Sequence, residues 1–142
     1  MPILNDAITF ATQAHKDQTD KNGDPYILHP LRVMGRVQSD AEKIVAVLHD
    51  IVEDTPCTFQ DLRDKGYSEQ VIEAIDCLTK RGEEESYDDF IERCQTNPIA
   101  LRVKIADLED NMDIRRLDVF TEGDLMHPNK YLKAWRRLTK VG

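Results

Sequence analysis

The segment VLHDIVEDT at residues 47–55 decides how the fold and the function of this chain are interpreted. It places one imidazole and three carboxylates within six consecutive positions. The residues that lead into it carry apolar side chains at helical spacing, over more than half of the helix circumference. A helix with so wide an apolar surface belongs in a protein interior, so the pattern predicts one buried helix over residues 40–55.

The four polar side chains of this helix fall on one edge. At about 100° per residue, His49 and Glu53 are stacked one turn apart, and so are Asp50 and Asp54. Burying three acids beside an imidazole costs several kcal/mol unless a positive charge compensates. A bound metal ion would supply that charge, so the segment predicts a metal site.

The composition limits the classes of protein that fit. The 142 residues suffice for one domain over residues 1–142. Hydrophobic residues make up 40% and charged residues 32%, while proline and glycine are scarce, so a soluble, mostly helical globular domain is expected. The formal net charge of −8 argues against nucleic acid or an anionic membrane as a partner. No apolar run is long enough to span a bilayer and no signal sequence follows Met1, so a cytoplasmic protein is expected. Cys57, Cys77 and Cys94 show no Cys-x-x-Cys spacing and are interpreted as buried free thiols.

Turn-forming and capping residues divide the rest of the chain into further helices. An amphipathic helix opens the chain and ends near His15, which is expected either to face the helix dipole or to pack on a neighbour. Residues 20–26 are dense in turn formers and form a candidate rim loop for a substrate site. His29 stands at the start of the next helix. Further helices are predicted at residues 58–62, 68–79, 86–97, 98–116 and from 128 onward, with an acidic turn at 81–85 that is either solvated or closes over a site.

A second polar edge lies on the helix before the last one. Lys104, Asp107 and Asn111 fall on one side of that helix, at spacings of three and four residues. Asp107 is flanked by apolar positions, and an ionised acid is rarely buried unless it is paired or bound to a metal. Glu109 and Asp110, in contrast, are consistent with ordinary solvent-facing charges.

Three motifs together resemble the HD superfamily of metal-dependent phosphohydrolases. GDPYILHP at residues 23–30, LHDIVEDT at 48–55 and VKIAD at 103–107, followed by Asn111 and Met112, are similar to the hydrolase domain of the RelA/SpoT alarmone enzymes and to the small alarmone hydrolases. The resemblance implies a single HD-domain helical bundle with a metal site between its helices. It also implies removal of the 3′-diphosphate from a guanosine tetra- or pentaphosphate, with release of pyrophosphate.

The resemblance also implies a cofactor. In that family two imidazoles and two carboxylates hold one divalent ion, usually Mn²⁺. This donor set suits a six-coordinate ion that keeps positions open for water and a phosphate oxygen, as a catalytic site requires. The positions that match the ligands are His29, His49, Asp50 and Asp107.

The remaining motif positions match residues that act on the substrate. Glu53 and Asp54 match the acidic pair that activates water and passes a proton to the leaving oxygen. The expected partner is a small nucleotide, a polyanion that needs local positive charge. The residues expected to bind it are Lys21 and Asn22 on the rim loop, Lys104, and Asn111, which matches a position that contacts the nucleotide.

Two positions depart from the family pattern. Asp20 stands where alarmone hydrolases usually carry an arginine that packs on guanine, and Leu108 stands where an arginine commonly follows the metal-binding acid. Because an acid cannot stack as a guanidinium does, an adenosine alarmone remains an alternative substrate. An HD phosphohydrolase acting on another nucleotide, such as a nucleoside monophosphate, is a second alternative. A non-catalytic nucleotide- or metal-sensing module is a third, which Glu53 and Asp54 argue against. Formation of a homo-oligomer is left open.

Overall fold

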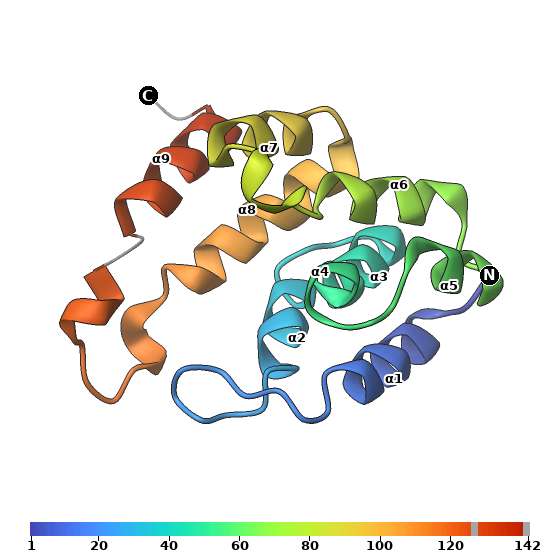
Figure 1. The fold of residues 1–142 in the computed structure, drawn as a ribbon, viewed down its shortest axis with the longest axis horizontal. Coiled ribbons are helices and arrows are strands. Elements are labelled where there is room, and N and C mark those ends of the chain that lie inside the picture. The colour runs from blue at the N-terminus through green and yellow to red at the C-terminus, as the bar shows by residue number, and fades with distance from the viewer. Residues whose placement is uncertain (126–127, 141–142) are drawn as a thin grey trace.

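The computed structural model describes residues 1–125 and 128–140, and this part of the chain is all-helical (Figure 1). Residues 126–127 and 141–142 of the predicted single domain lie outside it. Within the described residues there is no strand, and a single β-bridge joins Thr19 to Pro25. The all-α prediction is therefore confirmed. The helices are α1 (Leu4–Ala14), α2 (Leu28–Met34), α3 (Asp40–Leu48), α4 (Ile51–Asp54), α5 (Phe59–Asp64), α6 (Glu69–Cys77), α7 (Tyr87–Gln95), α8 (Pro98–Asn111) and α9 (Pro128–Thr139), with short 3₁₀ helices η1 (Gly82–Glu84), η2 (Ile114–Arg116) and η3 (Glu122–Leu125).

Capping residues fix where the central helices begin. The Ser39 side chain accepts a hydrogen bond from the Glu42 amide, and the Glu42 side chain bonds back to the Ser39 amide in a capping box. Asn97 caps α8 by accepting from two amides of the first turn, and proline occupies the position after it. These local contacts fix the starts of α3 and α8.

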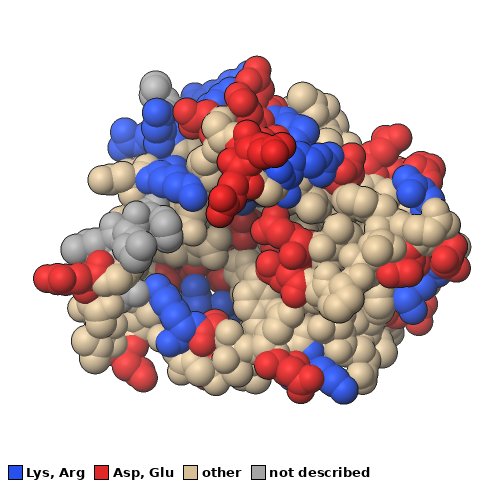
Figure 2. Space-filling view, viewed as in Figure 1, with Lys and Arg blue, Asp and Glu red and all other residues tan. Residues whose placement is uncertain are grey.

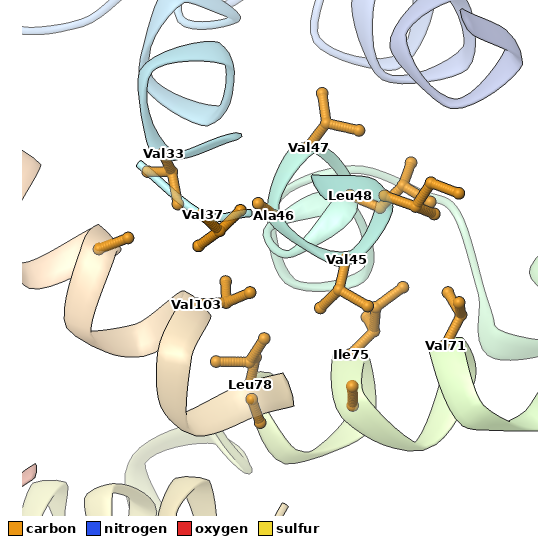
Figure 3. Close-up of a cluster of buried hydrophobic side chains, with 14 of the residues drawn as sticks. Val33, Val37, Val45, Ala46, Val47, Leu48, Val71, Ile75, Leu78 and Val103 are labelled. Carbon is orange, nitrogen blue, oxygen red and sulfur yellow. The ribbon is translucent and has the colours of Figure 1, made fainter. Parts of the chain in front are cut away.

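Helix α3 forms the centre of the molecule and packs against α1, α2, α6 and α8. Figure 3 shows Val45 and Leu48 of α3 among apolar side chains of the surrounding helices, including Val33, Ile75 and Val103. Burying apolar surface stabilises a fold by about 25 cal/mol per Å². The end of α3 is therefore held in place from several sides.

The central helix is interrupted, so the prediction of one helix over residues 40–55 is wrong at this point. Helix α3 ends before His49, and α4 begins after Asp50. In a continuous helix the Ala46 carbonyl would accept the Asp50 amide. Here it accepts the Nδ1–H of His49 at 2.6 Å. The same carbonyl also accepts the His49 amide at 3.4 Å, so these two bonds from His49 stand in place of the bond that a continuous helix would make.

Two other predictions need correction. The helix predicted at residues 98–116 ends at Asn111, and Asp113 then caps the short helix η2 by accepting from the Arg115 amide. All three cysteines are free, but only Cys94 is buried, whereas the other two are half-buried. None of the helices that the structure describes has the length and apolar character needed to cross a membrane.

Candidate metal centre and substrate cleft

Three elements that are distant in sequence bring the predicted metal ligands together. His29 comes from α2, whereas His49 and Asp50 form the junction between α3 and α4, and one ligand atom of each lies within 4.8 Å of the others. Asp107, on α8, places its Oδ1 2.8 Å from His29 Nε2 and 3.3 Å from His49 Nε2. Asp107 therefore contacts both imidazoles of the group that His29, His49 and Asp50 form.

The donor atoms of this cluster fit a divalent cation. Because the Nδ1–H of His49 donates to the Ala46 carbonyl, Nε2 carries the lone pair in the neutral ring. This Nε2 atom is buried and has no hydrogen-bond partner among the described residues. A buried acceptor without a partner costs free energy, and a cation between it and the neighbouring carboxylates would remove that cost.

Asp110 is a residue of the candidate site that the sequence interpretation missed. It is fully buried, so its expected role as a solvent-facing charge is wrong. Its Oδ2 lies 2.6 Å from Nδ1 of His29, and its Oδ1 accepts from Nε of Arg32 at 2.8 Å. A carboxylate behind a histidine ligand fixes the ring with the other nitrogen facing the metal. The three-residue spacing from Asp107 is the sequence signal that places Asp110 on the same side of α8.

The charges of the cluster are strongly coupled. Burial by itself lowers the pKa of His29, but hydrogen bonds to Asp107 and Asp110 outweigh it and raise the pKa to about 10. Burial alone raises the pKa of Asp107, but Lys104 and His29 hold it well below its ordinary value. A proton on His29 thus offsets the carboxylate charge, and a bound cation would take its place.

Tyr26, just outside the cluster, orients one of its carboxylates. Its hydroxyl donates to Oδ2 of Asp50. Its ring lies between those of His15 and His29, with centroids 5.1 and 5.7 Å away. His15 is buried and bonds Gln18 through Nδ1 at 2.8 Å, so it packs on a neighbour as expected.

The predicted acidic pair lies beside the cluster on α4. An Oε1 atom of Glu53 accepts the Lys80 amide at 2.9 Å. Burial, with the carboxylates of Asp50 and Glu53, raises the pKa of Asp54 to about 6. Both acids line the same cleft as the cluster. A carboxyl group with a pKa near neutrality is suited to exchange protons with water.

The cluster lies in a cleft of about 910 Å³. Figure 2 shows a hollow on this face, with acidic side chains inside it and both basic and acidic side chains around it. The cleft offers a polyanion local positive charge that the overall charge of −8 does not suggest. The basic residues that line it are Lys21, Arg32, Lys80, Lys104, Arg116 and Lys130.

Two of the predicted substrate-binding residues contact a metal ligand directly. Lys104 is buried and donates from Nζ to Oδ2 of Asp107 at 2.9 Å. Asn111 donates from Nδ2 to Oδ1 of the same carboxylate at 3.4 Å. Both residues line the cleft. In this structure both side chains therefore hydrogen-bond to Asp107.

The rim loop has a defined turn. Asp20 accepts hydrogen bonds from the amides of Asn22 and Asp24, at 2.8 and 3.0 Å through the same Oδ1. Lys21 lines the cleft, whereas Asn22 is outside the lining and bonds the Arg116 carbonyl through its side chain at 3.4 Å. The acid that departs from the family pattern therefore shapes the loop.

These features define a class of protein: an all-helical domain in which two histidines and two aspartates, from α2, the α3–α4 junction and α8, converge in a cleft lined by both acidic and basic residues. No protein-family model matches the chain. Individual relatives do. A protein from Aquifex aeolicus named guanosine-3′,5′-bis(diphosphate) 3′-pyrophosphohydrolase is 33% identical over 127 residues, which is 82% of this chain and 18% of that protein.

Other relatives carry similar names. The bifunctional (p)ppGpp synthase/hydrolase SpoT of Escherichia coli K12 is 37% identical over 81 residues, or 54% of this chain and 11% of that protein. A GTP pyrophosphokinase of Myxococcus xanthus is 31% identical over 140 residues, or 86% of this chain and 18% of that protein. The chain spans less than a fifth of the length of these relatives.

A solved structure has the same fold. It is described as a metazoan ortholog of SpoT that hydrolyzes ppGpp and plays a role in starvation responses, and it superposes with a TM-score of 0.78 at 21% identity, over 95% of this chain and 84% of that one. The chain is an all-helical domain that resembles the RelA/SpoT hydrolases in sequence and has the fold of the SpoT ortholog.

Proposed function

We propose that this chain is a (p)ppGpp-type alarmone 3′-pyrophosphohydrolase that uses one Mn²⁺ ion. The observation that carries the proposal is the buried Nε2 of His49, which faces carboxylates in a cleft that is also lined by lysine and arginine, and which has no hydrogen-bond partner among the described residues. The names of the relatives support the reaction. The ligands in this proposal are His29, His49, Asp50 and Asp107.

The division of labour follows from the positions of the side chains. A bound ion would acidify water and neutralise charge on the phosphoryl group. Glu53 and Asp54 lie beside the cluster, where they would orient the attacking water and pass its proton to the leaving oxygen. Asp110 and Tyr26 would hold His29 and Asp50 in place during the reaction.

The cleft suits a nucleotide that carries several phosphates. Arg32 and Lys104 reach the cluster by ion pairs with Asp110 and Asp107, so positive charge lies next to the proposed reaction centre. Lys21 lines the cleft and is proposed to contact phosphate, and Asn111 to contact the nucleotide. A polyanion would gain from these local charges in spite of the acidic chain.

A second candidate differs in the base. Asp20 is engaged in the turn of the rim loop, and Leu108 is fully buried in the core. Because these positions hold an aspartate and a leucine, neither of them presents a guanidinium to a purine ring. This observation favours an adenosine 3′-diphosphate, or another nucleotide, as an alternative to the guanosine compound.

The test is pyrophosphate release by the Mn²⁺-loaded protein from guanosine and adenosine 3′-diphosphates, with nucleoside mono- and triphosphates alongside. Chelator-sensitive cleavage confined to the 3′-diphosphates is the expected result, and the preferred base then decides between the two candidates. Phosphate released only from the ordinary nucleotides would contradict the proposal. No turnover of any compound by protein that retains Mn²⁺ would indicate a sensing module.

A further inference from the structure

One arginine holds the junction between α6 and α7, on the side of the cleft where α4 lies. Arg93 donates two parallel hydrogen bonds to Glu85, from Nε to Oε2 at 3.0 Å and from Nη2 to Oε1 at 2.7 Å. Both side chains are partly buried. Bidentate pairs of this kind combine charge with a fixed geometry, so Glu85 is anchored and does not belong to a freely solvated turn.

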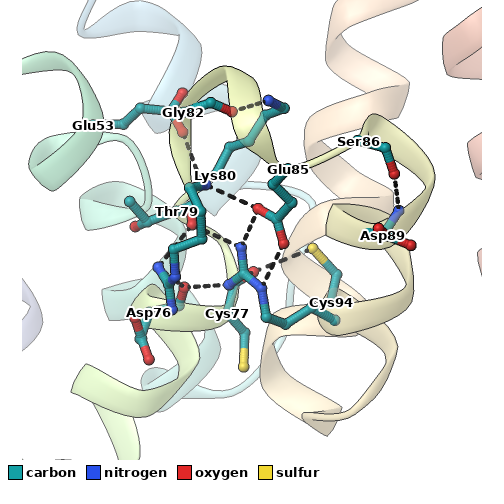
Figure 4. A network of polar contacts seen from close by, with 12 residues as sticks. Glu53, Asp76, Cys77, Thr79, Lys80, Gly82, Glu85, Ser86, Asp89 and Cys94 are labelled. Atoms are coloured by element: carbon teal, nitrogen blue, oxygen red, sulfur yellow. Dashed lines mark hydrogen bonds and ion pairs between the residues drawn. The ribbon is translucent and has the colours of Figure 1, made fainter.

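The same guanidinium also satisfies the end of α6. It donates to the carbonyls of Asp76, Cys77 and Thr79 at 2.8, 3.1 and 2.9 Å. The last carbonyls of a helix lack partners within the helix and need donors from elsewhere. Arg93 therefore fixes both ends of the α6–α7 connection, and Figure 4 shows this network with Glu85 at its centre.

A second arginine closes the turn between these two ends. The Arg81 amide donates to Glu85 Oε1 at 2.8 Å, and its guanidinium bonds Asp76 Oδ1 at 2.6 Å and the Thr79 carbonyl at 3.0 Å. The hydrogen bonds from Arg93 lower the pKa of Glu85 to about 2. Of the acidic turn at residues 81–85, positions 81–84 are exposed, as the solvated alternative predicted, whereas Glu85 is half-buried and held by the two arginines.

The network that Arg93 and Arg81 form with Glu85, called the brace below, acts on one peptide plane. The Thr79 carbonyl that Arg93 binds and the Lys80 amide belong to the same planar unit, so fixing the oxygen fixes the direction of the N–H. That N–H points away from the arginine and donates to Oε1 of Glu53 at 2.9 Å (Figure 4). The position of Arg93 thereby sets the direction of the Lys80 N–H, which binds the Glu53 carboxylate in the cleft.

We propose that Arg93 is a positioning residue that holds the Glu53 carboxylate in the cleft through the peptide plane between Thr79 and Lys80. The inference rests on the proposed function, since it assigns a purpose to the position of Glu53. Lysine cannot replace Arg93, because an ammonium group cannot span a carboxylate and three carbonyls at once.

The experiment compares Arg93→Lys with wild type and with Arg63→Lys, which alters an exposed arginine that pairs with Glu69 on the surface. Hydrogen exchange at the Lys80 amide is followed by NMR, and kcat, KM and Mn²⁺ affinity are measured on the same samples. In Arg93→Lys we expect Lys80 exchange to accelerate by about tenfold or more. We expect kcat to fall by between about tenfold and a hundredfold while KM and Mn²⁺ affinity stay unchanged, and Arg63→Lys to change none of them.

A double mutant separates positioning from a general loss of structure. If Arg93 acts through Glu53, then Arg93→Lys adds no further loss of kcat to Glu53→Gln. Equal losses in both backgrounds would overturn the inference, and so would unchanged exchange at Lys80 in Arg93→Lys. Should Arg93→Lys fail to fold, Glu85→Gln loosens the same brace and is judged by the same two measurements.

The proposed function and this inference can fail separately. A wild-type protein that releases no pyrophosphate from the nucleoside 3′-diphosphates would contradict the proposed function. Exchange at the Lys80 amide needs no substrate, so it still supports or overturns the coupling between Arg93 and Glu53 by itself.

Discussion

One hydrogen bond of the His49 side chain has two structural consequences. Its Nδ1–H takes the Ala46 carbonyl, which interrupts the central helix between α3 and α4. The same bond leaves Nε2 as the lone-pair atom that faces Asp50 and Asp107. The break in the helix and the orientation of the proposed ligand therefore have the same cause.

Two substitutions separate metal binding from catalysis. Asp54→Asn should retain Mn²⁺ and lose turnover by about a hundredfold or more, because the side chain lies outside the ligand cluster but would move the proton. Asp107→Ala should lose both, because it removes an oxygen next to both imidazoles. Bound metal is measured by elemental analysis and turnover by pyrophosphate release. Unchanged turnover in Asp54→Asn would remove that residue from the proposed mechanism.

The role of Asp110 behind His29 is tested by metal affinity. We expect Asp110→Ala to weaken Mn²⁺ binding by about 10- to 100-fold, because His29 loses the acceptor that fixes its ring. Titration calorimetry gives the affinity without any need for turnover. Asp113→Ala is the control, because Asp113 accepts from Arg115 at the next turn and does not contact a ligand. Equal affinities in both variants would contradict this role.

At the scale of elements, the site is built at helix ends. His29 lies in the first turn of α2, the α3–α4 break supplies two ligands, and the last two turns of α8 supply Asp107 and Asp110. Helix ends leave backbone groups and side chains accessible to a cleft, whereas helix middles are covered by packing. The α6–α7 connection adds the amide that bonds Glu53.

The brace at this connection should make stability depend on pH. The pKa of Glu85 is lowered from an ordinary value of 4.5 to about 2 in the folded protein. The unfolded chain therefore binds more protons in this interval, so the stabilisation is complete above about pH 4.5 and is lost as the pH falls towards 2. At pH 7, Glu85→Gln should lower the free energy of unfolding by about 1–2 kcal/mol.

Urea denaturation between about pH 3 and pH 7 measures this effect as the difference between wild type and Glu85→Gln. That difference should shrink at the acidic end. Glu83→Gln, which changes an exposed acid of the same turn, should show a difference near zero throughout. A Glu85 difference that does not vary with pH would contradict the assignment.

At the scale of the whole molecule, the cluster joins parts of the chain that only the core brings together. Helices α2 and α8 both pack against α3, and each contributes to the four proposed ligands. An ion bound by all of them would bridge the fold across its centre. Binding to the folded state alone stabilises that state by mass action.

Mn²⁺ at about a hundred times its dissociation constant should stabilise the fold by about 2.7 kcal/mol. For a domain of this size the melting temperature should rise by about 5–10 °C. Scanning calorimetry with and without a chelator measures the shift, and Asp107→Ala should show little of it. A melting temperature that does not respond to Mn²⁺ in wild type would count against a site between the helices.

The sequence by itself determined the helical class, most helix starts and the residues of the candidate cluster. Apolar periodicity and caps such as Ser39 and Asn97 act over a few residues, so they can be recognised locally. The acids at Asp50 and Asp107 were conspicuous because they lie among apolar neighbours. The resemblance to a known family then linked them to His29, which carried no signal alone.

Only the tertiary structure decided the break at His49, the burial of Asp110 and the pairing of Glu85 with Arg93. Each depends on a partner whose position is set by packing: Asp110 meets His29 across 81 positions of sequence, and Lys80 meets Glu53 across 27. Local periodicity assigns a side chain to a face of its helix, but it does not say which helix covers that face. The core packing around α3 supplies that information, because it fixes which helix ends meet at the cleft.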